Sequence, residues 1–249
     1  MNSQGTILLV GATSALGRAF AGALAKKGYA LVLAGRSEDE ISRVAADIRL
    51  RFGVQTAVEV YDARESDASE ALLLRAIDQV PGSLAGLVLC HGSMPDEVQT
   101  RGDASLRGDA IRVNYTSAIE LIEAAVPHLA PGSDSFILAV TSVAGDRGRP
   151  SNALYGSSKG ALALYLSGLR SRLSREGVRV LTVKPGFIDT RMTWGLPGLF
   201  AVASPERVAA DALRGLRKNR AVVYSPGFWR LIMLVIRLIP DPIFRRLQF

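Results

Sequence analysis

Tyr155 and Lys159 stand four residues apart in a stretch, Asn152 to Leu166, whose apolar spacing predicts a helix. Residues at positions i and i+4 of a helix share one face, so the phenol and the ammonium would lie one turn apart. A phenol with its ordinary pKa of about 10 is a poor acid or base at neutral pH. A nearby positive charge lowers the pKa of the phenol and favours phenolate, the state that a proton shuttle needs. The pair therefore predicts a proton-transfer site.

Ser142 follows an apolar run at residues 135–141 that predicts a buried strand. In an open α/β sheet, the carboxyl ends of the strands border the crevice in which ligands bind. A hydroxyl placed there can donate a hydrogen bond to a substrate carbonyl and polarise it toward hydride. Together with Tyr155 and Lys159, Ser142 predicts a site for carbonyl reduction. The intact set argues against the alternative of a non-catalytic NADP-binding sensor.

A turn with two glycines, residues 11–17, lies between a buried strand at residues 6–10 and a helix. Glycines let the backbone approach a pyrophosphate closely, and the N-terminus of the next helix supplies N–H donors and a positive dipole end. The residues expected to bind the dinucleotide here are Gly11, Thr13, Ser14, Ala15, Leu16 and Gly17. The alternative is a merely tight strand–helix connection.

Arg36 and Ser37 follow the second predicted strand, at the place where NAD-preferring folds usually carry a carboxylate for the ribose 2′-hydroxyl. A guanidinium and a hydroxyl suit a 2′-phosphate instead, so NADP(H) is expected over NAD(H). The alternative is that Arg36 is solvated and that Glu38 or Asp39 binds the ribose. Asp62, just after the third strand, could accept from the adenine amino group or could cap a helix.

The elements that must position these residues alternate along the chain. Strands are expected at residues 6–10, 30–34, 54–60, 84–90, 135–141 and 178–183, and helices at 15–27, 38–52, 66–79, 104–129 and 152–176. Strands that are apolar on both faces and are separated by helices indicate a parallel sheet covered on both sides. Right-handed crossovers then give a doubly wound (Rossmann) α/β fold with three α/β/α layers. We expect one domain over residues 1–249, with an apolar helical extension from about Ala203.

Composition narrows the class of protein. Of 249 residues, 48% are hydrophobic, which excludes a disordered chain. One cysteine and two histidines exclude a disulfide framework and a His/Cys metal cluster, so no metal is expected. The formal charge of +7 is compatible with nucleic acid, an anionic membrane or a phosphorylated substrate. The body of the chain has no basic stripe interleaved with aromatic residues, so binding of nucleic acid is not expected. With no secretory signal and no apolar run long enough to span a bilayer, a cytoplasmic protein is expected.

Over nearly its whole length the chain resembles the short-chain dehydrogenase/reductases. The resemblance rests on the glycine turn, Asn114, Ser142, Tyr155-x-x-x-Lys159 and the run Pro185-Gly186…Thr190. It implies that Tyr155 donates the proton, that Lys159 lowers its pKa and holds the nicotinamide ribose, and that Ser142 positions the carbonyl. Asn114 would hold a water linking Lys159 to bulk solvent, unless it is only a helix-bend asparagine. The residues implied to flank the nicotinamide and its phosphate are Pro185, Gly186, Ile188 and Thr190.

Two segments depart from that family's pattern. Ala15 stands where a glycine is usual, and Leu89-Cys90-His91-Gly92 replaces the common Asn-Asn-Ala-Gly, so only Gly92 is retained as a cofactor residue. His91 is expected to be a packing or loop residue rather than a catalyst. The resemblance also implies a homodimer or homotetramer that pairs through the helices at 104–129 and 152–176.

Two regions bear on the substrate. Arg147 and Arg149, between Ser142 and Tyr155, could clamp a phosphate, or they could belong to an exposed loop with a salt bridge to Asp146. In the amphipathic tail at 226–249, arginines seven residues apart share one stripe of an otherwise apolar helix, and the net charge is +3 (four Arg, one Asp). Such a helix could lie in an anionic bilayer interface, or it could be buried or form a subunit contact.

The tail, the Arg-x-Arg loop and the Asn-Tyr-Thr at residues 114–116 resemble one branch of the family, the decaprenylphosphoryl-2-keto-erythro-pentose reductases. The resemblance implies a polyprenyl-phosphate keto-sugar substrate, a flavin oxidase partner and a peripheral location on the inner face of the cell membrane. The alternative is a reductase of soluble or acyl ketones whose tail is an oligomer contact.

Overall fold

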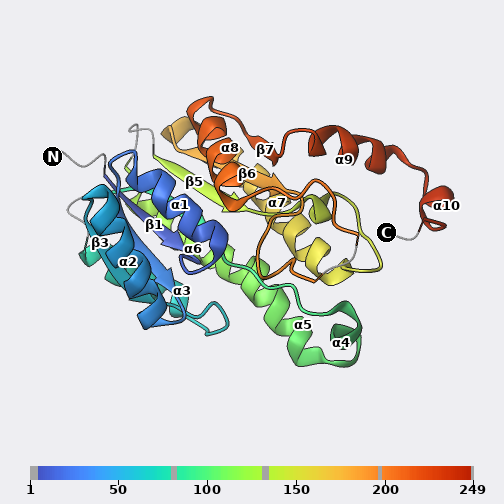
Figure 1. Cartoon of the computed structure of the whole chain (residues 1–249), viewed down its shortest axis with the longest axis horizontal. Helices are drawn as coiled ribbons and strands as arrows, with labels where there is room; N and C mark the ends of the chain where they lie inside the picture. The colour runs from blue at the N-terminus through green and yellow to red at the C-terminus, as the bar shows by residue number, and fades with distance from the viewer. Residues whose placement is uncertain (1–4, 80–82, 131–134, 196–197, 248–249) are drawn as a thin grey trace.

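A single sheet organises the chain (Figure 1). In the computed structural model, which describes residues 5–79, 83–130, 135–195 and 198–247, seven strands pair in the order β3-β2-β1-β4-β5-β6-β7, and every pair is parallel. The strands are β1 Thr6–Val10, β2 Ala30–Gly35, β3 Thr56–Val60, β4 Leu84–Leu89, β5 Phe136–Val140, β6 Arg179–Pro185 and β7 Val222–Ser225. The start of the chain and the last two residues of the predicted tail lie outside the described residues.

Helices cover both faces of this sheet, and each face has its own apolar core. One core is formed with α1 Ala15–Ala25, α2 Glu38–Phe52 and α8 Pro205–Arg217. The other is formed with α3 Ala68–Asp78, α6 Ser117–Ala125 and α7 Ala153–Leu173. The doubly wound α/β/α prediction is confirmed.

The strand order reverses between β1 and β4. The chain runs from β1 outward through β2 to β3 and then returns to β4 on the opposite side of β1. A parallel sheet opens a crevice at the carboxyl ends of the strands where the order reverses. Here the backbone N–H of Cys90 donates to the carbonyl of Val10 at 2.9 Å, so the segment after β4 lies beside the glycine turn. The fold therefore brings residues 11–17 and 90–92 to one place.

The single helix expected at 104–129 is broken. It consists of α5 Ala104–Ile111, a π-helical turn at Arg112–Thr116, α6, and a 3-10 turn at Val126–His128. The backbone N–H of Ser117 donates to the carbonyl of Arg112, five residues back, which inserts one extra residue into the turn. Sequence analysis also did not place α4 Glu97–Gly102 or the edge strand β7.

The C-terminal segment turns back along the loop that follows β5. It comprises α9 Trp229–Leu238 and α10 Asp241–Phe244, which extend at the end of the molecule beyond β7 in Figure 1. Trp229 and Met233 are buried and pack with Val143, the residue after Ser142. Among the described residues, no helix combines the length and the apolarity needed to cross a bilayer.

Candidate active site

The glycine turn is closed by Ser14, which is the N-cap of α1. Its hydroxyl accepts from the backbone N–H of Gly17 at 2.9 Å and donates to the carbonyl of Gly11 at 2.8 Å. A Cβ on Gly17 would lie 2.1 Å from the carbonyl oxygen of Gly11, and a Cβ on Gly11 (φ +86°) would lie 2.7 Å from the backbone nitrogen of His91. Both positions require glycine, and the turn leaves the N-terminus of α1 facing the crevice, as a pyrophosphate site requires.

The adenosine side of the crevice carries a cavity of about 300 Å³. Its lining residues are Arg36, Val60, Tyr61, Asp62, Glu65, Ala68, Ala71 and Arg75. Arg36 is exposed at the end of β2, and Ser37 caps α2 by accepting from the backbone N–H of Glu40 at 3.4 Å. Asp62 is paired with Arg64 at 2.5 Å, and hydrogen bonding to that guanidinium holds the pKa of Asp62 below its ordinary value. The fold thus brings Arg36 and Asp62, two of the residues predicted to bind the adenosine side of the cofactor, to one cavity, whereas Ser37 is not among its lining residues.

Ser142, Tyr155 and Lys159 come together at the carboxyl end of β5. The Ser142 hydroxyl accepts from the backbone N–H of Ala144 at 3.1 Å and acts on the pKa of the Tyr155 phenol, and the Lys159 ammonium donates to the carbonyl of Val140 at 3.3 Å. Ser142 and Lys159 are both buried. The fold therefore brings the three predicted catalytic residues to one end of the sheet.

Close glycine contacts hold this arrangement. A Cβ on Gly156 would lie 2.7 Å from the carbonyl oxygen of Ala144, and a Cβ on Gly145 would lie 2.7 Å from the backbone nitrogen of Gly160. The turn that follows Ser142 therefore packs backbone to backbone on the helix that carries Tyr155. This contact was not predicted from the sequence. A signal for it was present, because Gly156 and Gly160 are four residues apart and so share one face of the helix.

The pKa of the Tyr155 phenol differs from the expectation. Burial raises it, and the hydrogen bond with Ser142 opposes that rise. Burial also lowers the pKa of Lys159 to about 8. The expected lowering of the Tyr155 pKa by Lys159 is wrong for this structure, because loss of solvation disfavours phenolate and the ammonium is directed to the carbonyl of Val140.

Asn114 lies in the π-helical turn and binds one neighbour through both ends of its side-chain amide. Its side-chain oxygen accepts from the backbone N–H of Ser93 at 3.0 Å, and its amide donates to the carbonyl of Ser93 at 2.7 Å. A Cβ on Gly92 would lie 3.0 Å from that Asn114 oxygen and 3.1 Å from the Lys159 nitrogen. Asn114 and Lys159 thus border the same glycine, while the bridging water stays a prediction.

The segment after β6 rests against α9. Pro185 ends β6, and the backbone N–H of Gly186 donates to the carbonyl of Ser225 at 3.1 Å. A Cβ on Gly186 would lie 2.0 Å from the indole nitrogen of Trp229. Farther along, the Thr193 hydroxyl bonds the carbonyl of Ile188 and accepts from the backbone N–H of Thr190. The predicted nicotinamide segment is therefore backed by Trp229, which sequence analysis did not connect with the site.

The two arginines before Tyr155 have different surroundings. The guanidinium of Arg147 donates to the carbonyls of Ile236, Arg237 and Ile239, pairs with Asp241 at 2.6 Å and lies 3.9 Å from the centre of the Phe244 ring. Because both of its terminal nitrogens bind the C-terminal segment, Arg147 does not fit the predicted role of a phosphate ligand.

In the described structure, Arg149 has two buried nitrogens, Nε and Nη2, without a hydrogen-bond partner. Burial lowers the pKa of its guanidinium. Asp146, the expected partner of these arginines, is instead bonded to Lys184 and Tyr224. Two donors of Arg149 are therefore unsatisfied within the described residues, although both nitrogens are buried.

Comparisons with known proteins agree with this geometry. The model of the short chain dehydrogenase family matches residues 5–197. An uncharacterized oxidoreductase of Mycobacterium tuberculosis is 30% identical over 241 residues, 97% of this chain and 96% of that protein. Sulfoacetaldehyde reductase 2 of Chromohalobacter salexigens is 32% identical over 222 residues, 83% of this chain and 79% of that protein. A solved short-chain dehydrogenase from Sphingobium yanoikuyae, in complex with NADPH, shares the fold with a TM-score of 0.78 at 23% identity, covering 95% of this chain and 97% of that one. This chain is thus an oxidoreductase of the short-chain dehydrogenase/reductase family.

Proposed function

We propose that this protein reduces a ketone with NADPH. The observation that carries the proposal is the placement of Ser142 beside Tyr155 at the carboxyl end of β5, with Lys159 buried one helical turn away. When bound, the nicotinamide supplies the hydride. The hydroxyl of Ser142 would hold the carbonyl oxygen, and Tyr155 would give that oxygen its proton as negative charge develops. A raised pKa keeps the phenol protonated at neutral pH, which favours the direction of reduction.

The preference for NADPH rests on Arg36. Its guanidinium is exposed beside the adenosine-side cavity, and Ser37 lies next to it at the N-terminus of α2. A 2′-phosphate there would meet a forked donor and the positive end of a helix dipole. Glu38 and Asp39, exposed in the first turn of α2, remain the alternative ribose ligands.

The substrate would carry an anionic group near its carbonyl. An unpaired guanidinium that is partly buried costs stability, so its two unpartnered nitrogens favour a ligand role for Arg149 over a structural one. A carboxylate, sulfonate or phosphate would accept from both nitrogens. A relative that is 32% identical is named for the reduction of sulfoacetaldehyde, a carbonyl compound with a sulfonate.

The C-terminal segment would place this site at an anionic membrane surface. The outward side of α9 exposes Leu231, Leu234, Val235 and Leu238, while its inward side packs beside the active-site loop. Four exposed arginines of this segment, Arg230, Arg237, Arg245 and Arg246, supply the charge that anionic headgroups attract. A polyprenyl-phosphate keto sugar, the substrate of the resembled branch, has both the anionic group and the lipid that such a site would meet.

The catalytic part is tested by replacing Tyr155 with phenylalanine. The variant should bind NADPH with the affinity of the wild type, measured by fluorescence titration, and should lose ketone reduction in a stopped assay at neutral pH. Arg149→Met should raise KM for an anionic ketone but not for a neutral ketone of similar size. Full turnover by Tyr155→Phe would refute the proposed chemistry.

The membrane part is tested with vesicles of phosphatidylglycerol and phosphatidylcholine. Leu238→Glu, in α9, should abolish co-sedimentation, whereas Leu50→Glu, which alters an even more exposed leucine on α2, should leave it unchanged. The molar mass of both variants, measured by light scattering, tests the alternative that α9 contacts another copy of the chain. If Leu238→Glu dissociates an oligomer and the wild type does not co-sediment with vesicles, α9 is a contact between copies of the chain and the membrane proposal fails.

A further inference from the structure

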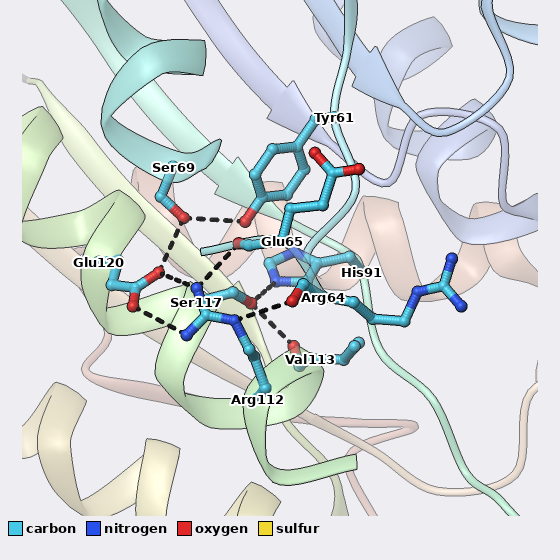
Figure 2. Close-up of polar contacts among 9 residues, drawn as sticks. All are labelled: Tyr61, Arg64, Glu65, Ser69, His91, Arg112, Val113, Ser117 and Glu120. Atoms are coloured by element: carbon cyan, nitrogen blue, oxygen red, sulfur yellow. Dashed lines mark hydrogen bonds and ion pairs between the residues drawn. The ribbon is translucent and has the colours of Figure 1, made fainter. Parts of the chain in front are cut away.

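The π-helical turn at Arg112–Thr116 contacts the loop at residues 61–65 on one side and Gly92, beside Lys159, on the other. Because the backbone N–H of Ser117 donates to the carbonyl of Arg112, the carbonyl of Val113 lacks its usual α-helical partner. The Ser117 hydroxyl replaces that partner by donating to the Val113 carbonyl at 3.1 Å (Figure 2). The extra residue in the helix is therefore stabilised by a side chain within the turn.

His91 supports that hydroxyl. Its Nε2 lies 3.0 Å from the Ser117 oxygen. The hydroxyl proton already points to the Val113 carbonyl, so the histidine nitrogen must be the donor in this pair. Burial lowers the pKa of His91 to about 3, so the ring is neutral at physiological pH. His91, which sequence analysis treated as a packing residue, has a defined polar role in holding the π turn.

Arg112 ties the same turn to the adenosine side. Its Nε donates to the carbonyl of Arg64 at 3.1 Å and its Nη2 donates to the carbonyl of Glu65 at 2.8 Å. Both Nη atoms also bind the carboxylate of Glu120 at 3.2 Å. Figure 2 shows the guanidinium of Arg112 between this carboxylate and the two carbonyls.

The network continues to the wall of the adenosine-side cavity. Glu120 accepts from the Ser69 hydroxyl at 3.2 Å, and Ser69 lies 3.0 Å from the phenol oxygen of Tyr61. Tyr61 and Glu65 both line the cavity that Arg36 and Asp62 share. At its other end the π turn carries Asn114, which borders Gly92 together with Lys159.

We infer that Arg112 and Ser117 are positioning residues, which couple the adenosine-binding loop at 61–65 to the placement of Asn114 beside Lys159. The inference rests on the proposed reductase function. Without these bonds the turn can rewind as an α-helix, and one residue fewer rotates the helix after it relative to the helix before it by about 100°. Such a change moves Asn114 away from Ser93 and alters the surroundings of Lys159.

The test compares two glutamates on α6. Glu120→Gln and Arg112→Gln alter the network, while Glu123→Gln weakens an ion pair of the same type, with Arg172, that joins α6 to α7 and does not touch the turn. We expect Arg112→Gln to weaken binding of adenosine 2′,5′-bisphosphate, measured by calorimetry, by about tenfold and to lower kcat by about tenfold. Glu120→Gln should shift both quantities in the same direction, and Glu123→Gln should keep both within twofold of the wild type.

Variants of Ser117 distinguish a positioning role from a contribution to general stability. Ser117→Ala should lower kcat without changing the affinity for adenosine 2′,5′-bisphosphate, and Ser117→Thr, which keeps the hydroxyl, should restore kcat. If Arg112→Gln does not fold, Arg112→Lys carries the same comparison. The inference is overturned if the Arg112 and Ser117 variants change only the melting temperature and keep affinity and kcat within twofold of the wild type, the result expected for Glu123→Gln. Nucleotide binding is measured without turnover, so an inactive wild type would count against the proposed function and not against the link to the adenosine site.

Discussion

Replacing Arg147 with alanine removes the side chain that joins the C-terminal segment to the loop before Tyr155. The guanidinium is only 14% exposed, and it donates to three carbonyls at the end of α9. Those carbonyls lie at a helix end that water can reach, so each lost bond costs about 1 kcal/mol rather than the full value for a buried charged bond.

The remaining contacts of Arg147 add little. Asp241 is 88% exposed, so its ion pair contributes close to nothing. Stacking on Phe244 contributes about 0.5–1 kcal/mol. Because one guanidinium makes all of these contacts, their contributions overlap, and we expect α9 and α10 to lose about 3 kcal/mol of local stability. That loss corresponds to an about hundredfold rise in the population of the opened segment.

Hydrogen exchange measured by mass spectrometry resolves this change. Peptides within residues 229–244 of Arg147→Ala should lose about two orders of magnitude of protection, while peptides of β1 and β4 keep theirs. Arg149→Ala, a change of the same charge on the same loop, should leave the protection of residues 229–244 as in the wild type. Equal protection in wild type and Arg147→Ala would show that the packing of Trp229 and Met233 alone fixes the segment, and the account of Arg147 would be wrong.

Three further predictions test the cofactor and catalytic regions. Gly17→Ala should destabilise the protein by about 3 kcal/mol in urea unfolding, because its Cβ would overlap the carbonyl of Gly11, whereas Gly108→Ala, with open space around it in α5, should be neutral or slightly stabilising. Arg36→Asp should raise KM for NADPH at least about tenfold and lower KM for NADH, while an unchanged ratio would exclude a 2′-phosphate contact. Burial lowers the pKa of Lys159 from its ordinary 10.5 to about 8, so between those values the unfolded chain binds more protons and stability rises with pH. The unfolding free energy of the wild type, minus that of Lys159→Met, should therefore increase from pH 8 to pH 10, and a flat difference would contradict the shift.

The fold could be predicted because its signals are local. The strands β2, β4 and β5 are continuous apolar runs, and a strand buried on both faces needs no other pattern. The edge strand β7, Val222–Ser225, has only four residues with Val222 exposed, so it becomes recognisable only by its pairing with β6. The π turn escaped prediction for a similar reason. Its hydroxyl bond is local, but the histidine that supports it comes from a strand end 26 residues earlier.

In the candidate site, the positions of the residues could be predicted from local patterns, but their electrostatic surroundings could not. Tyr155 and Lys159 were recognisable by helical spacing, and Ser142 by its place at the end of a strand. The pKa of Tyr155 was predicted with the wrong sign, because spacing shows the charge of a neighbour but not the loss of solvation or the direction in which the ammonium points.

Arg147 and Arg149 have different surroundings that their sequence positions could not predict. The two side chains are identical, lie two residues apart and were given the same role from sequence. Arg147 is used by carbonyls about 90 residues later in the chain, which become neighbours only when β7 returns the C-terminal segment to the loop after Ser142. Arg149 is left with two nitrogens that no described group satisfies. The same loop therefore holds α9 through Arg147 and, two residues later, carries a guanidinium whose two buried nitrogens have no partner among the described residues.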